Sequence, residues 1–320
     1  MKIAITGSSG LIGTAVARHL TGGGHQVLRL VRRPPKAADE VQWNPRPAAG
    51  GAVAAPAAGG AAGPAAAPAA QPASAALEGV DAVINLAGAP IASSRWTDAR
   101  KHEIRASRVD GTRALASLLA GLGRRPAVLL SGSAIGFYGD TGDRAVTESA
   151  PSGHGFIPGV VRDWEAATGA AEQAGIRVVH LRTGIVLGGS GGILGKLVPL
   201  FRLGLGARLG SGSQYMSWIA LADVVGAIGF LLEKPDVAGP VNLTTPHPVT
   251  NAKFTAALAA ALGRPAILRV PSAVLGFALG EAAGELLTSA RVLPGQLTDA
   301  GYEFTYADID GALTGELRSH

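Results

Sequence analysis

Three glycines follow the first apolar run of the chain. The run Lys2–Thr6 leads directly into Gly7, Gly10 and Gly13, and Leu11–Leu20 then shows the 3.6-residue spacing of a helix. In such a turn the first glycine permits tight folding, the second lets backbone amides approach a pyrophosphate, and the third lets the helix pack closely. The free amides and the helix dipole then attract an anion. We predict a dinucleotide-binding turn formed by Gly7, Ser9, Gly10, Leu11, Ile12 and Gly13. The alternative is an ordinary glycine-rich turn in a chain with 46 glycines.

Apolar runs and helical stretches alternate along most of the chain. The runs that read as buried strands are 2–6, 27–31, 82–87, 127–131 and 178–181. This alternation predicts an α/β fold, a Rossmann-like doubly wound parallel sheet. We assign 1–187 plus 217–245 to this nucleotide-binding domain. We assign 188–216 plus 246–320 to a smaller, mostly helical C-terminal cap for the substrate.

Composition excludes several classes of protein. With 47% hydrophobic and 16% charged residues the chain is not wholly disordered, and without cysteine it has no disulfides or thiolate metal sites. A net charge of +5 with 5% aromatics favours a small anionic molecule over nucleic acid. The seven scattered histidines predict no metal site, and the N-terminus shows no signal pattern, so we expect a cytoplasmic protein. The oligomeric state stays open.

One segment of biased composition interrupts the pattern. Of the thirty residues 47–76, 27 are Ala, Pro or Gly and none is charged. Five prolines and five glycines exclude a continuous membrane-spanning helix. We therefore predict that 46–76 is a flexible insert that crosses no membrane.

The end of the second predicted strand bears on the choice of cofactor. A site for NAD usually has an acidic residue there to accept from the ribose 2′-hydroxyl. This chain has Val31, Arg32 and Arg33, with no acid before Asp39. Because a guanidinium matches a 2′-phosphate, we predict NADP(H). The alternative is two solvated surface arginines.

Longer motifs resemble one protein family. The glycine spacing after Thr6, together with the segment Ala82–Gly88, resembles the extended short-chain dehydrogenase/reductases of the nucleoside-diphosphate-sugar epimerase group. More specific motifs are similar to its atypical branch of epimerase family proteins, some of which are described as cell-division inhibitors. These motifs are Ser131–Gly139, Asp163-Trp164-Glu165, Arg182–Gly188, Phe201–Gly206, Gly210–Gly212, Met216–Ile219, Gly280-Glu281, Arg291–Pro294 and Gly301–Phe304. The resemblance covers the chain except for 46–76.

The resemblance implies a set of cofactor contacts. They are expected at Val31, Arg32, Leu86, Ala87, Gly88, Glu103, Arg108 and Val186. The residues support Arg108 independently, because it lies four residues after Ile104 on the apolar stripe of the helical stretch 97–122. A charge on a buried face is costly unless paired, so Arg108 either forms a structural ion pair or faces an anionic cofactor. Glu103 could equally be a solvated acid.

The chain departs from the family in its catalytic residues. Typical members use a Tyr with a Lys four residues later, which lowers the pKa of the phenol. No Tyr-x-x-x-Lys occurs here, and its place is taken by Phe156–Val160. Ser133 and Tyr138 remain nearby as hydrogen-bond partners for a substrate carbonyl or hydroxyl. Otherwise they are a strand-end cap and a packed aromatic.

Three functions follow from these residues. We predict an NADP(H)-dependent oxidoreductase or epimerase for a small polar, sugar-nucleotide-like substrate. Basic side chains would hold an acidic substrate, and the candidates are Arg182, Lys196, Arg202 and Arg208. The rival is a non-catalytic NADPH-binding sensor. A remote alternative is an α/β-hydrolase that uses Ser190 with Asp223 or Asp236 and His247, although we expect Asp223 to cap its own helix.

Overall fold

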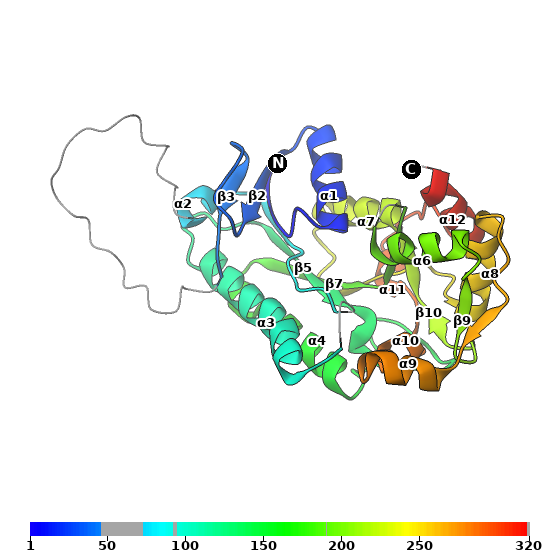
Figure 1. Cartoon of the computed structure of the whole chain (residues 1–320). Helices are drawn as coiled ribbons and strands as arrows, with labels where there is room; N and C mark the ends of the chain where they lie inside the picture. Colours follow the sequence, from blue (N-terminus) through cyan, green and yellow to red (C-terminus); the bar gives the residue numbers. More distant parts are fainter. Residues whose placement is uncertain (46–72, 92–94, 190, 319–320) are drawn as a thin grey trace, which may run out of the picture.

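Seven parallel strands form the central sheet of the protein. The computed structural model describes residues 1–45, 73–91, 95–189 and 191–318, and Figure 1 shows their arrangement. The strand order is β12-β7-β5-β4-β1-β2-β3, so the chain starts in the middle and winds outward in both directions. The strands are β1 (Lys2–Thr6), β2 (Gln26–Val31), β3 (Glu40–Gln42), β4 (Ala82–Asn85), β5 (Val128–Ala134), β7 (Arg177–Thr183) and β12 (Gly239–Leu243). The predicted doubly wound parallel sheet is confirmed.

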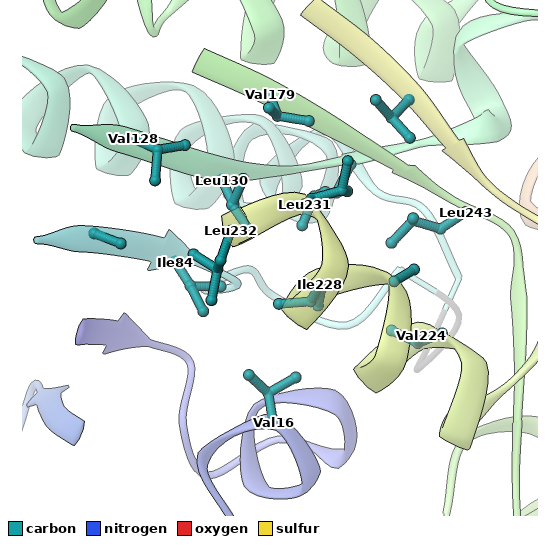
Figure 2. Close-up of a cluster of buried hydrophobic side chains, with 14 of the residues drawn as sticks. Val16, Ile84, Val128, Leu130, Val179, Val224, Ile228, Leu231, Leu232 and Leu243 are labelled. Carbon is teal, nitrogen blue, oxygen red and sulfur yellow. The ribbon is translucent and has the colours of Figure 1, made fainter. Parts of the chain in front are cut away.

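Two layers of helices cover the sheet. Helices α1 (Leu11–Gly22) and α7 (Leu221–Glu233) pack on one face, where Val16, Val224 and Ile228 meet alternate strand residues. Figure 2 shows these side chains pointing toward the strands. The opposite face is covered by α2 (Ala73–Leu77), α3 (Asp98–Ala120) and α5 (Gly169–Gln173). Burial on both faces explains why the strands read as continuous apolar runs rather than alternating ones.

The third helix has the start and the buried stripe that its sequence predicts. The Thr97 hydroxyl accepts a hydrogen bond from the amide of Arg100 and so caps α3. Of the predicted stripe Ile104, Leu115, Leu118 and Leu122, all are buried except Leu118, which is half-buried, and Leu122 lies just beyond the helix end. Arg108 is buried with them, which brings a charge onto the apolar face.

The C-terminal part is mainly helical, as predicted. Its helices are α6 (Gly192–Arg202), α8 (Asn251–Ala261), α9 (Ser272–Leu279), α10 (Ala282–Leu287), α11 (Gly295–Asp299) and α12 (Ile309–Arg318). Short two-stranded sheets join them, in which β8 (Ile185–Gly188) pairs with β11 (Trp218–Ala220) and β9 (Ala207–Leu209) pairs with β14 (Leu268–Val270). Two further pairs are β10 (Tyr215–Met216) with β13 (Val249–Thr250), and β6 (Ala145–Val146) with β15 (Arg291–Val292). The proposed boundaries between the two domains stay a prediction.

Two local predictions need correction. The predicted insert extends too far, because its residues 73–76 belong to α2, whose Leu77 is fully buried; residues 46–72 lie outside the described residues. Asp223 does not cap its own helix, since α7 begins at Leu221. Its carboxylate instead accepts hydrogen bonds from the amides of Thr305 (2.6 Å) and Tyr306 (3.0 Å).

Within the described ranges, no helix is long and apolar enough to span a bilayer.

Candidate active site

The glycine turn between β1 and α1 is closely packed. Gly7 has a φ of +68°, and a Cβ there would lie 2.7 Å from the carbonyl of Leu86, which directly follows the neighbouring strand β4. At Gly13 a Cβ would lie 2.2 Å from the carbonyl oxygen of Gly7, so only glycine lets the helix start this close to the turn. Gly10 precedes the helix and offers no side-chain cap. The first backbone amides of α1 at Leu11 and Ile12 are therefore left for a ligand or solvent.

A hydrogen-bonded link fixes the end of β4 beside this turn. The Thr6 hydroxyl donates to Asn85 Oδ1 (2.7 Å) and accepts from the amides of Leu86 (3.1 Å) and Ala87 (3.2 Å). Asn85 in turn donates to the Thr112 hydroxyl on α3 (2.9 Å). The predicted contact residues Leu86, Ala87 and Gly88 are thus held next to the glycine turn.

Arg108 is the buried charge of this region. Only 8% of the residue is exposed, and it forms no ion pair with any acidic residue in the described part of the chain. Its Nη1 donates to the carbonyl of Ile104 (3.2 Å). Burial, and secondarily the charge of Arg100, lowers the pKa of the Arg108 guanidinium to about 10, so it stays protonated at neutral pH. A Cβ on Gly88 would lie 3.4 Å from the Arg108 Cζ, so the guanidinium lies against that glycine.

The two arginines after β2 differ in their surroundings. Arg33 forms two hydrogen bonds of 2.7 Å to the carboxylate of Glu40, whose pKa these bonds and the amide of Lys36 lower to about 2. The exposed side chain of Arg32 has no ion pair among the residues that the structure describes. Arg32, rather than Arg33, therefore presents an available guanidinium at the end of β2.

The predicted catalytic hydroxyls belong to one buried network. Ser133, Arg182 and Asn242 are register partners on the adjacent strands β5, β7 and β12. Glu165 reaches them from α4 (Phe156–Ala166) and accepts from Ser133 Oγ (2.6 Å) and twice from Arg182 (2.8 and 2.9 Å). The Tyr138 hydroxyl accepts from Arg182 (2.9 Å) and donates to Asn242 Oδ1 (2.8 Å). The structure thus brings Ser133 and Tyr138 together through a buried ion pair.

The electrostatics of this network follow from burial. Burial by itself would raise the pKa of the Glu165 carboxyl, but the hydrogen bonds from Arg182 and Ser133 outweigh it and the pKa is lowered. Burial raises the pKa of the Tyr138 phenol, and Arg182 opposes this only in part. Glu165 is therefore ionised and Tyr138 neutral at physiological pH, and both hydroxyl protons are already donated within the protein.

The other predicted residues lie as follows. Glu103 is exposed on α3 and forms an ion pair with Arg100 (2.6 Å), whereas Val186 is half-buried in β8. Arg182, suggested as a ligand for an acidic substrate, is 3% exposed and committed to Glu165 and Tyr138, so that suggestion is wrong. Ser190, the nucleophile of the hydrolase alternative, lies outside the described residues. Within the described ranges no cluster of acidic residues and histidines could hold a metal ion.

Two residues of this region escaped the sequence interpretation. Glu165 and Asn242 are essential parts of the network, yet nothing in their spacing shows that they meet. Glu165 stands in the motif Asp163-Trp164-Glu165, which identified a resemblance but not a role. The signal that could have found Glu165 is a carboxylate in a helical stretch that follows the strand of Ser133.

Comparisons with known proteins identify the family of this chain and agree with its fold. The sequence profile of the NAD dependent epimerase/dehydratase family matches residues 3–243, and a domain of unknown function, DUF1731, matches residues 270–315. The chain is 46% identical over 312 residues to the epimerase family protein MT2273 of Mycobacterium tuberculosis, covering 97% of this chain and 96% of that protein.

Two solved structures are similar over the described fold. The crystal structure of human epimerase family protein SDR39U1 (isoform 2) with NADPH is 30% identical, with a TM-score of 0.85 and full coverage of both chains. That of the nucleoside-diphosphate sugar epimerase from Corynebacterium glutamicum is 36% identical, with a TM-score of 0.77, and covers 99% of this chain and 58% of that one. The resemblance seen in the sequence motifs is confirmed, and the chain belongs to the NAD dependent epimerase/dehydratase family.

Proposed function

We propose that the protein binds NADP(H) and uses it for oxidoreductase or epimerase chemistry on a small polar substrate. The observation that carries the proposal is the buried Arg108 guanidinium, which has no carboxylate partner among the described residues and lies against Gly88. A buried charge of this kind is stabilised by an anionic partner. Human SDR39U1, which has the same fold, was crystallised with NADPH.

The residues present fit this cofactor. Gly7 and Gly13 let the turn close against Leu86 and the start of α1, and Gly10 adds no side chain in front of the helix. The first amides of α1, which have no side-chain cap, would hold the pyrophosphate. We assign the adenosine and its 2′-phosphate to Val31 and Arg32, because Arg32 is exposed and Arg33 is occupied by Glu40. The remaining proposed contacts are Ser9, Leu11, Ile12, Leu86, Ala87, Gly88, Glu103, Arg108 and Val186.

The chemistry would take place beside Ser133. When bound, the nicotinamide ring would supply or accept a hydride. Because Ser133 donates its proton to Glu165, it offers lone pairs to a ligand and would accept a hydrogen bond from a substrate hydroxyl. The Tyr138 hydroxyl accepts from Arg182 and donates its proton to Asn242, so we assign it the positioning of Arg182 rather than direct proton transfer.

The substrate would be held by the C-terminal part. A cavity of about 640 Å³ opens between the loop 140–143 and the C-terminal part, and the polar side chains among its lining residues could hold a hydroxylated ligand such as a sugar nucleotide. Asp140, Ser211, Tyr215 and Arg269 are among its lining residues.

The experiment is a turnover assay with the whole chain. Sugar nucleotides and small carbonyl compounds are mixed with the protein and NADPH, and oxidation is followed by the loss of NADPH absorbance. Sugar nucleotides are also incubated with NADP-loaded protein and analysed for epimers. Turnover that a Ser133→Ala variant loses supports the proposal. Failure of the wild-type protein to bind NADPH would overturn it.

A second function is favoured by one specific observation. Both candidate hydroxyls already donate within the protein, to Glu165 and to Asn242, and the Tyr-x-x-x-Lys pair is missing. A module that senses NADPH without converting it needs no free proton donor. This alternative predicts tight NADPH binding with neither oxidation nor epimerisation of any substrate in the panel.

A further inference from the structure

The side chain of Trp164 lies between the buried Arg108 and the strand that carries Ser133. The Arg108 Cζ is 5.2 Å from the centre of the Trp164 ring, a distance at which the ring attracts the cation. The indole also lies against β5, where a Cβ on Gly132 would be only 3.1 Å from the Trp164 Cζ2. The absence of a side chain at Gly132 therefore makes room for the indole next to Ser133.

The indole is held in this position by contacts of two kinds. Its Nε1 donates to the Thr112 hydroxyl (2.9 Å), which also accepts from Asn85 Nδ2 (2.9 Å). Val109 and Ala167 pack around it in a small buried cluster. Because the ring is 7% exposed and hydrogen-bonded, it has little freedom to turn away from Arg108.

Arg108 has few other groups that fix its direction. It donates to the carbonyl of Ile104 one turn earlier and has no acidic partner in the described part of the chain. Of the aromatic rings in the described residues, only Trp164 contacts its guanidinium. The indole is thus the main side-chain feature that could hold the guanidinium toward Gly88.

We propose that Trp164 is a positioning residue that orients the Arg108 guanidinium toward the anionic cofactor. Its neighbour Glu165 positions Ser133, so that two adjacent residues of α4 organise the cofactor side and the reaction side of the site. The inference rests on the proposed binding of NADP(H).

The test measures the dissociation constant of NADPH by calorimetry in graded variants of the whole chain. Trp164→Phe keeps an aromatic face and should bind NADPH within about threefold of wild type, whereas Trp164→Leu should bind about 3- to 30-fold more weakly. In an Arg108→Met background both substitutions should have no further effect. This loss of additivity separates positioning through Arg108 from a general structural change.

Trp218→Phe is the matched control. Trp218 is fully buried and hydrogen-bonded to the carbonyl of His247, but it lies in the apolar cluster of the C-terminal part. It should lower thermal stability and leave NADPH affinity unchanged. The inference is overturned if Trp164→Leu binds NADPH as tightly as wild type, or if its effect persists unchanged in Arg108→Met. If the wild-type protein itself does not bind NADPH, the proposed function fails instead.

Discussion

Replacing Glu165 by Gln should destabilise the fold strongly, because it removes the carboxylate that pairs with the buried Arg182. The side chains of Arg182 and Glu165 are 4% and 11% exposed, so water screens their interaction little. The substitution removes the charge behind two of the three hydrogen bonds of Arg182 and leaves the bond to Tyr138. Removing one partner of a buried ion pair lowers the free energy of unfolding by about 3–5 kcal/mol. Because Arg182 keeps its hydrogen bond to Tyr138, we expect a loss of about 3 kcal/mol.

The assay is the free energy of unfolding from urea titrations followed by circular dichroism. The pKa of Glu165 is lower in the folded protein than in the unfolded chain, so its stabilisation is present above the unfolded pKa of about 4.3. It is lost as the pH falls through the folded pKa. The difference between wild type and Glu165→Gln should therefore be constant near neutral pH and shrink in acid.

An exposed ion pair supplies the control. Lys253 and Asp310 are paired at 2.9 Å with side chains 54% and 57% exposed. Asp310→Asn should change the free energy of unfolding by less than about 1 kcal/mol. Combining Glu165→Leu with Arg182→Met should restore much of the loss. The reasoning is refuted if Glu165→Gln lowers the free energy of unfolding as little as Asp310→Asn does. It is also refuted if the free energy of unfolding of wild type and of Glu165→Gln falls equally in acid.

Three further predictions concern the cofactor turn and the C-terminal segment. Arg32→Glu should weaken NADPH binding about tenfold to a hundredfold and NADH binding much less, and equal losses for both would exclude a 2′-phosphate contact. Gly13→Ala should abolish NADPH binding in calorimetry, since its Cβ would meet the Gly7 carbonyl at 2.2 Å. Asp223→Asn weakens the anchor of Thr305 and Tyr306, so limited proteolysis should cut near 300 faster than in wild type.

The fold and the glycine turn were predictable because their signals are local. Buried strands read as apolar runs, and Gly7 and Gly13 sit where a side chain would meet neighbouring backbone. The burial of Arg108 followed from its place four residues after Ile104 on one helix face. Periodicity and steric constraint within a few residues are visible in a single sequence.

The polar network was not predictable for the opposite reason. Glu165 and Arg182 are separated by a helix end, a second helix and most of β7, and they meet only once α4 packs on the sheet. Arg182 was therefore interpreted as a substrate ligand. Asp223 shows the same limit, since local spacing suggested a helix cap but its partners lie about eighty residues later. Contacts set by tertiary packing override local preference.

The central claim is that Arg108 holds an anionic cofactor, and the affinity of an Arg108→Met variant for NADPH tests it most directly. Arg113→Met on the same helix is the matched control, since the Arg113 side chain is 61% exposed and forms a surface ion pair with Asp110. Calorimetric titration should show wild type and Arg113→Met binding NADPH equally well, and Arg108→Met binding it about tenfold to a hundredfold more weakly. Equal affinity of Arg108→Met and wild type would contradict the claim.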